Sequence, residues 1–596
     1  MAQVGKVDPI TLTTVWHALR RVCFEMRYVV ERTCQSSLIA QLHDLTTGIW
    51  DRDGRTVAFP VGLAPQFALG IFPIRVIREK YGDNIYPGDV FLTNDPYHGG
   101  ANTHLPDWRF FRPIFHKDDL LFFTMVEAHQ MDTGGAFPGG YFPNAYDIHA
   151  EGICIPPIKV FEKGVERSDI LELIWNNVRF VEAVRVDNYA MIASTKICEK
   201  RIGELLQRYG KEVVSACVEE MMDRMERAVR SEIAKMPDGT YYGEAASDDD
   251  GTELDVPVWI RCELTIRGEE LTVNFSKSDG QRKGFVNCVY GPTFAESVVA
   301  AMLFFDPALS EFHNEGSFRP IHVISPEGNV TNCRYPATVG GMGVSMGTQI
   351  MEAFLVAMSQ AVPGRAVAAW GRHRGDYTFG TNLKTGEPYV KTSFDYDGSA
   401  GAVFGFDGYA GATTLGTLGS VNRGNVEEEE IRVPWRIAKY QFATDLTGAG
   451  RWRGGPGVEW EAVNEGSDAG MATGSSDGDE MLGPGALGGH PTPPARTYIR
   501  RGEELIRVKS HRMVQVKTGD VVVKHSSGGA GVGLPEERDP EKVSEDVLNQ
   551  LVSPQAARDV YKVVLDPVTL QVDWEKTRIQ RRGQSPVKSE KVEGSL

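Results

Sequence analysis

The chain has 596 residues, of which 41% are hydrophobic and 24% charged, so it is long enough for about two to four packed globular domains. Its net charge of -17, without a long basic run in the body of the chain, argues against nucleic acid or an anionic membrane as the main partner. No apolar run approaches the roughly 20 residues of a membrane helix, and the N-terminus has no signal-peptide core. The 8 cysteines form no CxxC pair and are typical of reduced thiols, so we expect a cytoplasmic protein.

The first elements in chain order are a helix followed by strands. Residues 8–37 are predicted to be helical, because apolar residues recur there at a nearly helical period. Residues 46–60 predict a hairpin around an Asp-Arg-Asp-Gly turn, and residues 89–94 and 120–129 predict two further strands. Each of these two strands ends in a loop rich in Asp, His and Gly, the kind of loop that holds functional residues.

The rest of the chain alternates between helical and strand patterns. Residues 168–235 have a helical pattern, and residues 256–278 predict strands. Apolar helices are expected at 293–305 and 348–362, and short strands with Gly-rich loops predominate from there to about residue 533. The tail from Lys576 is polar and locally basic, and we expect it to be disordered.

Together these elements predict an α+β fold with several domains, in which mixed sheets carry flanking helices and many Gly-rich loops. The predicted domains are an N-terminal α+β domain with the candidate metal site (1–205), a smaller helix-plus-strands domain (206–290), a β-rich domain with helices (291–545), and a C-terminal helix with a disordered tail (546–596).

Histidines and aspartates gather where the predicted strands end. His104 and Asp107 stand three residues apart in "THLPD", and His129 ends the next predicted strand. Two strands that end at the same edge of a sheet would bring these side chains together. Two imidazoles with one or two carboxylates suit a divalent Mn, Fe or Zn ion, and Asp44 before the hairpin could add a carboxylate. On spacing alone, a polar loop whose histidines bind backbone groups explains the pattern equally well.

Several longer blocks resemble one family. They include "GDVFLTNDPYHGGANTHLPD" at Gly88, "HQMDTGG" at His129, "PDGTYYGE" at Pro237 and "ERDPEKVSEDVLNQLVSPQAARDVYKVVL" at Glu537, and they follow the family's order over nearly the whole chain. On these blocks the chain resembles the hydantoinase B/oxoprolinase family, which includes subunits of cyclic amide hydrolases and of ketone carboxylases.

The resemblance implies which side chains hold the metal. In that family an H-x-x-D pair, a later histidine and an upstream aspartate bind a divalent ion, and these correspond here to His104, Asp107, His129 and Asp44. Asp132 follows the last histidine and is expected to orient a water molecule or carry a proton. His149 is either a second proton-transfer group or a histidine satisfied within its loop.

The resemblance also implies an ATP-dependent enzyme of two components. A hydantoinase A-type partner would bind ATP with Mg, which agrees with the absence of a GxxxxGK[ST] motif here. This chain would then hydrolyse a phosphate-activated cyclic amide, of the hydantoin, lactam or 5-oxoproline type, with its metal ion. The alternatives are a ketone carboxylase subunit that works with an additional small subunit, and a non-catalytic scaffold with a structural metal. The glycine-rich turn at 339–347 is either an anion cradle or a close packing contact.

Overall fold

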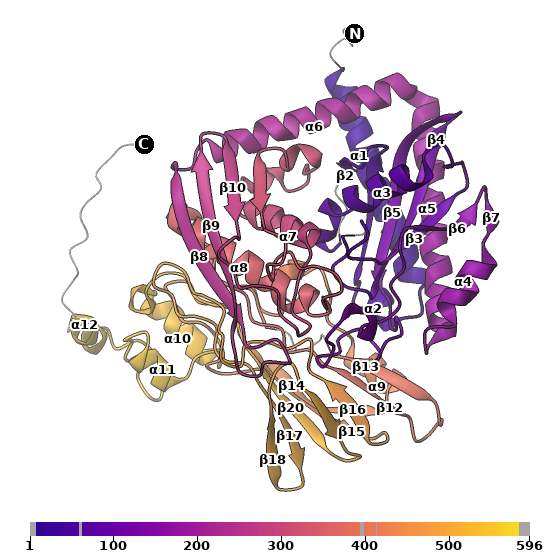
Figure 1. Cartoon of the computed structure of the whole chain (residues 1–596). Coiled ribbons are helices and arrows are strands. Elements are labelled where there is room, and N and C mark those ends of the chain that lie inside the picture. Colours follow the sequence, from indigo (N-terminus) through magenta and orange to yellow (C-terminus); the bar gives the residue numbers. More distant parts are fainter. Residues whose placement is uncertain (1–6, 59–61, 100, 394–397, 413, 583–596) are drawn as a thin grey trace.

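A seven-stranded antiparallel sheet built from the first third of the chain positions the candidate site (Figure 1). The structure, a computed structural model, describes residues 7–58, 62–99, 101–393, 398–412 and 414–582. The strand order is β2 (Thr56–Ala58), β1 (Leu45–Asp51), β5 (Asp119–His129), β4 (Asp107–His116), β3 (Val90–Thr93), β6 (Ile158–Glu162) and β7 (Val165–Glu166). The predicted hairpin and the two predicted strands are confirmed, and β4 is a strand that the sequence reading missed.

Helices cover both faces of this sheet. On one face, α1 and α5 pack against β1, β4 and β5, and on the other face Ile74 and Ile77 of α3 pack against Trp50 and Phe91. The helix α1 begins where the Asp8 carboxylate accepts a hydrogen bond from the Thr11 N–H at 2.9 Å, with Pro9 in its first turn. The helices around this sheet are α1 (Pro9–Thr33), α2 (Ser37–Ala40), α3 (Ile71–Tyr81), α4 (Ser168–Trp175), α5 (Val181–Tyr209) and α6 (Lys211–Ile233).

A second sheet lies beside the first and is joined to it by α6 (Figure 1). The N-terminal half of α6 packs into the core of the first sheet, and its C-terminal half packs into the core of the second. Two apolar helices, α7 (Tyr290–Met302) and α8 (Gly347–Ala361), share that second core, which confirms both predicted helices. The strand order is β11 (Ile321–Ile324), β10 (Glu270–Asn274), β9 (Val258–Arg267) and β8 (Gly239–Ser247), and β10 and β11 are parallel.

Two further sheets form the β-rich part of the chain beyond residue 364 (Figure 1). The four-stranded sheet contains β13 (Pro388–Thr392), β12 (Tyr377–Thr381), β16 (Ala469–Ala472) and β19 (Met513–Val516). The five-stranded sheet contains β14 (Trp435–Phe442), β15 (Val458–Asn464), β20 (Val521–Ser526), β17 (Arg496–Arg501) and β18 (Glu504–Val508), and α9 (Val426–Arg432) leads into it.

The described part of the chain ends in three short helices, α10 (Pro540–Leu548), α11 (Pro554–Asp559) and α12 (Trp574–Arg582). The guanidinium of Arg538 is buried between Asp407 and Asp546 and ties this segment to the body of the protein. The predicted disorder from Lys576 is wrong for residues 576–582, which form α12, and residues 583–596 lie outside the described residues.

The predicted fold class, a multi-domain α+β protein with mixed sheets and Gly-rich loops, is confirmed. The domain boundaries stay a prediction. All 8 cysteines are free, as expected of reduced thiols. Among the residues that the structure describes, no helix is both long enough and apolar enough to cross a membrane.

Candidate metal centre

Three strand ends meet at one edge of the seven-stranded sheet and bring the predicted ligands together. Asp107 is the first residue of β4 and pairs in register with His129, the last residue of β5. Asp44 directly precedes β1, and its carbonyl oxygen accepts a hydrogen bond from the His129 N–H at 3.2 Å. His104 lies in the turn that leads into β4. The antiparallel register therefore sets the positions of these candidate ligands through the backbone, independently of any contact between their side chains.

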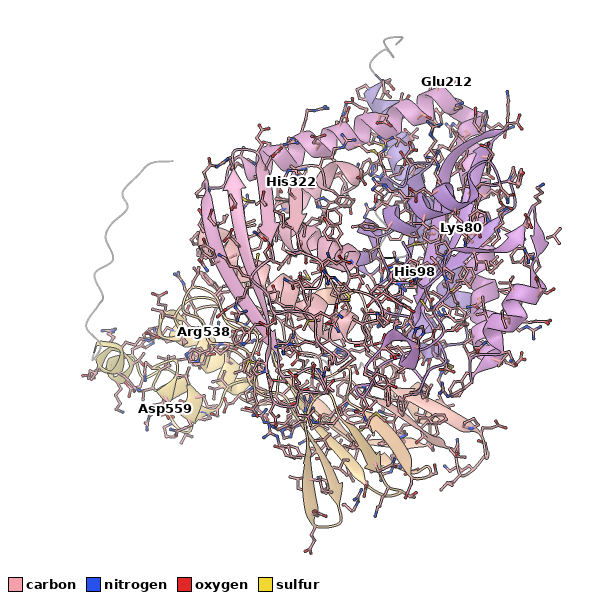
Figure 2. All side chains as sticks on the ribbon, in the orientation of Figure 1. Lys80, His98, Glu212, His322, Arg538 and Asp559 are labelled. Carbon is pink, nitrogen blue, oxygen red and sulfur yellow. The ribbon has the colours of Figure 1, made fainter. Side chains whose placement is uncertain are left out.

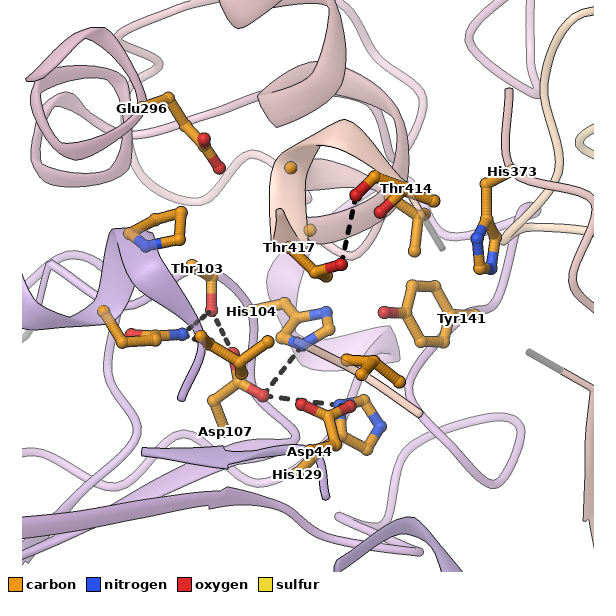
Figure 3. A pocket seen from close by; sticks show the side chains of 17 residues that line it. Asp44, Thr103, His104, Asp107, His129, Tyr141, Glu296, His373, Thr414 and Thr417 are labelled. Carbon is orange, nitrogen blue, oxygen red and sulfur yellow. Dashed lines mark hydrogen bonds and ion pairs between the residues drawn. The ribbon is translucent and has the colours of Figure 1, made fainter. Parts of the chain in front are cut away.

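The side chains converge on one carboxylate oxygen. Oδ1 of Asp107 lies 3.0 Å from Nε2 of His104 and 3.3 Å from Nδ1 of His129 (Figure 3). Oδ2 of Asp44 lies 3.9 Å from the same nitrogen of His129. One donor atom from each of His104, Asp107 and His129 lies within 4.8 Å of the other two, and all three residues are buried. A group of this composition and burial could hold a divalent ion.

The hydrogen bonds around His104 favour a cation at this point. Nδ1 of His104 lies 3.3 Å from the carbonyl oxygen of Gly340, which accepts but cannot donate. The proton of a neutral ring therefore sits on Nδ1, and the lone pair of Nε2 faces the Asp107 carboxylate. Two lone pairs 3.0 Å apart repel unless a proton or a metal ion lies between them. The donor set therefore fits a metal ion, which would replace that proton.

The charges of the cluster are strongly coupled. Burial alone would raise the pKa of Asp107, but His104 and His129 hold it well below its usual range. Burial alone would lower the pKa of His104, but the Asp107 carboxylate raises it above its ordinary value. Burial raises the pKa of Asp44 to about 6, although His129 opposes the rise. Without a metal the cluster therefore keeps a proton next to an ionised Asp107, and metal binding would release it.

A second layer of polar groups orients Asp107. Its Oδ2 accepts hydrogen bonds from the hydroxyl of Thr103 and from Nε2 of Gln66, the latter at 3.2 Å. Gln66 is itself held by Arg109, whose Nη2 donates to the Gln66 Oε1 at 2.6 Å. Arg109 on β4 lies opposite Glu127 on β5, so the chain of contacts that orients Asp107 continues into the sheet. Such supporting contacts commonly set the orientation of metal ligands.

The glycine-rich turn at 339–347 holds a carboxyl group that belongs to the chain itself. The carboxylate of Glu151 accepts hydrogen bonds from the N–H groups of Val339, at 3.0 Å, and Gly340, at 2.7 Å. The predicted anion cradle is therefore filled by a buried side chain. Because the Gly340 carbonyl oxygen contacts His104, Glu151 fixes the turn that orients this candidate ligand.

The cluster lies at the floor of a cavity whose other walls come from distant parts of the chain (Figure 3). The cavity has a volume of about 70 Å³, and the empty space between the surrounding atoms, counted with its open side, is about 610 Å³. Sequence reasoning missed the other lining residues, which include Tyr141, Glu296, His373, Thr414 and Thr417. One signal was available, because Glu296 is a carboxylate within an otherwise apolar helix.

The structure does not bring Asp132 to the cavity. Its buried carboxylate accepts hydrogen bonds from the backbone N–H and Nη1 of Arg179 and from the N–H of Gly134. It is absent from the residues that line the cavity, so its geometry supports a role in holding the loop after β5. The predicted role as a proton carrier remains a prediction that this placement does not favour.

His98 and His149, two further histidines near the cluster in sequence, lie at the surface. His149 is exposed, and its Nε2 lies 3.0 Å from the hydroxyl of Tyr335. His98, labelled in Figure 2, places its Nδ1 2.8 Å from the Asp95 carboxylate, and its side chain is 63% exposed. Neither histidine lines the cavity. The position of His149 therefore fits a histidine satisfied within its loop better than a proton-transfer group.

Fold and site together define a multi-sheet α+β protein with a buried His/Asp centre. The family model described as hydantoinase B/oxoprolinase matches residues 8–535. The chain is 31% identical to caprolactamase subunit beta of Pseudomonas jessenii over 572 residues, which cover 94% of this chain and 97% of that subunit. The chain therefore belongs to the hydantoinase B/oxoprolinase family, which confirms the resemblance seen in the sequence.

Two further comparisons extend this result. The crystal structure of the ATP-dependent caprolactamase from Pseudomonas jessenii matches with a TM-score of 0.88 and 29% identity, covering 97% of this chain and 100% of that one. The chain is also 23% identical to the acetophenone carboxylase delta subunit of Aromatoleum aromaticum over 627 residues, which cover 96% of this chain and 88% of that subunit.

Proposed function

We propose that this chain is the hydantoinase B-type subunit of an ATP-dependent two-component enzyme that hydrolyses a phosphate-activated cyclic amide. The observation that carries the proposal is the convergence of His104, Asp107 and His129 at the floor of a cavity that is open on one side. The likeness to a caprolactamase subunit over almost the full length of both chains supports the substrate class.

Four residues of this chain would hold the ion: His104, Asp107 and His129, with Asp44 as a further carboxylate. A divalent Mn, Zn or Fe ion supplies Lewis acidity, which lowers the pKa of water and polarises a carbonyl or phosphoryl oxygen. Thr103 and Gln66 hold Asp107 in place, and the Gly340 carbonyl oxygen keeps the proton of His104 on Nδ1. The cavity open on one side leaves room for a substrate next to the ion.

The ATP-dependent step is assigned to a partner. This sequence contains no Walker A motif, and a hydantoinase A-type subunit would bind ATP and Mg and phosphorylate the amide oxygen. The two subunits would form a hetero-oligomer in the cytoplasm.

Carboxylation of a ketone is the second candidate, because the chain also resembles a subunit of acetophenone carboxylase. In that case a phosphorylated enolate would take up CO2, an additional small subunit would be encoded nearby, and ATP turnover would need both a ketone and bicarbonate. The third possibility, a structural metal in a non-catalytic scaffold, predicts activity that does not depend on the cluster.

The experiment combines this chain with its co-encoded partner and measures ADP and product. Caprolactam, hydantoin, 5-oxoproline, acetone and acetophenone would be assayed with and without bicarbonate, and metal content would be determined. His104→Ala and His129→Ala test the cluster, and His98→Ala is the matched control, because it lies in the same loop but outside the cavity.

Ring opening that both cluster variants lose together with the metal, and that His98→Ala retains, supports the hydrolase. Product that forms from a ketone and bicarbonate contradicts the hydrolase function and supports the carboxylase function. Full activity in both cluster variants contradicts the catalytic metal and supports the scaffold.

A further inference from the structure

Glu296 faces the cavity from the wall across from the cluster. It lies in the middle of α7, and Figure 3 shows its carboxyl group directed into the space above Thr103 and Thr417. The helix is apolar and packs into the core of the second sheet, so a carboxyl group is out of place there unless the cavity uses it.

One oxygen of the Glu296 carboxyl group, Oε2, is buried without a hydrogen-bond partner among the described residues. The residue as a whole is 3% exposed. Burial raises the pKa of Glu296 well above its usual range. At neutral pH Glu296 therefore carries a proton. Because Glu296 lines the cavity, this acid lies next to the space that a substrate would occupy.

A glycine in the next helix makes room for this carboxyl group. A Cβ atom on Gly347 would lie 2.6 Å from Oε1 of Glu296, which is too close for any real contact. The first residue of α8 is thus shaped around the carboxyl group. Gly347 offers a way to displace the acid without changing Glu296 itself.

The proposed reaction needs an acid at such a position. When water adds to the phosphorylated amide, the carbon carries a hydroxyl, a phosphate ester and the ring nitrogen. Phosphate leaves more easily than an unprotonated amine, and its departure would restore the cyclic amide and waste the ATP. Protonation of the ring nitrogen makes the amine the better leaving group, so that the ring opens.

We propose that Glu296 is the catalytic acid that protonates the ring nitrogen and thereby directs the adduct toward ring opening instead of a futile cycle. The proposal rests on the proposed cyclic amide hydrolysis. The C–N bond breaks, its electron pair stays on nitrogen, and nitrogen takes the proton of Glu296. The hydroxyl group of the adduct becomes a carbonyl and returns its proton to the Glu296 carboxylate. The products are an amine and an acyl phosphate, which a second water molecule converts to carboxylate and phosphate.

Glu296→Gln is the central variant, because an amide has almost the same shape but cannot transfer a proton. The exchange replaces one neutral group by another, so the fold and the metal content should be retained. Gly347→Ala displaces the carboxyl group, and Glu296→Asp keeps an acid on a shorter arm. Ser297→Ala is the matched control, since Ser297 neighbours Glu296 in α7 but its hydroxyl donates to the Thr293 carbonyl outside the cavity.

The assay uses the complete two-component enzyme, its metal, ATP and the ring that the wild type opens, in water labelled with ¹⁸O. Two quantities are measured: ring-opened product formed per ADP, and ¹⁸O in the recovered cyclic amide. A futile cycle places oxygen from water in the amide carbonyl, because the original oxygen leaves with phosphate.

In Glu296→Gln we expect product per ADP to fall by about 100-fold, with ¹⁸O accumulating in the recovered amide. Gly347→Ala should shift both readouts in the same direction, Glu296→Asp should restore part of the coupling, and Ser297→Ala should match the wild type.

Two results would overturn the assignment: a Glu296→Gln enzyme with the wild-type ratio of product to ADP, or a parallel loss of ADP and product without ¹⁸O in the amide. A wild-type enzyme that opens no ring contradicts the proposed function itself and is recognised before any variant is made.

Discussion

The two walls of the cavity differ in how their polar groups are satisfied. We call Asp44, His104, Asp107 and His129 the ligand wall, and Glu296 with Thr414 and Thr417 the α7 wall. On the ligand wall each carboxylate and ring contacts another polar group, and a second layer holds Asp107 from behind. On the α7 wall Oε2 of Glu296 is buried without a hydrogen-bond partner among the described residues.

This difference indicates that one wall is organised for a cation and the other for a substrate. The ligand wall is organised in advance, so that a cation can enter without rearrangement of the fold. The α7 wall keeps an unsatisfied donor, which costs stability and is retained where a substrate supplies the missing partner. Substitutions on the ligand wall should therefore affect metal binding, and substitutions on the α7 wall should affect the reaction of the bound substrate.

Asp107→Ala should have the largest effect. The variant removes the oxygen on which both histidines converge and leaves Thr103 and Gln66 without their acceptor. We expect bound metal to disappear and ring opening to fall by at least about 1000-fold, which corresponds to several kcal/mol. Metal analysis and turnover of the two-component enzyme check this. Retained metal at wild-type stoichiometry would show that Asp107 is not a ligand.

Gln66→Ala should have a smaller effect of the same kind. The substitution removes one of the two donors to Asp107 Oδ2 and the acceptor of Arg109, but leaves the candidate ligands in place. We expect metal affinity or activity to fall by about 10–100-fold. Titration of the metal-free protein with zinc measures the affinity. Thr417→Ala on the α7 wall is the comparison and should bind zinc like the wild type.

Glu151→Gln should change how stability depends on pH. Burial raises the pKa of Glu151 to about 8, against the lowering by the N–H groups of Gly340 and Val339. The native state therefore keeps a proton that the unfolded chain has lost, and stability falls as pH rises between the ordinary pKa and about 8. Glu151→Gln does not lose stability in this way. Its free energy of unfolding should therefore rise relative to that of the wild type by up to about 1.4 kcal/mol per pH unit.

Thermal midpoints of the metal-free wild type and of Glu151→Gln, taken at pH 5, 7 and 9, measure this trend. Midpoints that keep a constant difference over the three values would show that Glu151 does not titrate in this window.

His149→Ala should have the smallest effect. Its side chain is exposed, and its one described hydrogen bond goes to the surface residue Tyr335. We expect activity within about twofold of the wild type, as for most surface substitutions. Steady-state turnover checks this. A loss of 10-fold or more, about 1.4 kcal/mol, would instead support a catalytic role for His149.

The sequence was most informative about the ligand wall. The blocks around His104 and His129 indicated the family, and the candidate ligands followed from that resemblance, because spacing alone left a polar loop as an equally good explanation. The strand between them was missed for a physical reason. β4 contains Arg109, Arg112 and Pro113, and buried charges and a proline argue against a central strand unless partners such as Glu127 and Thr195 are known.

The α7 wall could not be predicted in the same way. Glu296 reaches the cavity only because α7 packs near residues 64–68, and Thr414 arrives from a loop more than a hundred residues further on. Neither the helical period of α7 nor its composition specifies that contact. A carboxylate in an apolar helix signals a function, but only the packed structure shows which space it faces.

The position of the donors along the chain has a consequence for synthesis. Asp107 and His129 pair in the hairpin β4–β5 and His104 lies in the turn just before it, so the three residues depend on a local pairing of the kind that forms quickly. Their part of the chain leaves the ribosome well before α7 or residues 414–417 have been made. A nascent chain could thus acquire its ion while the substrate cavity is still missing, and the ion would then serve as a template around which the later segments assemble.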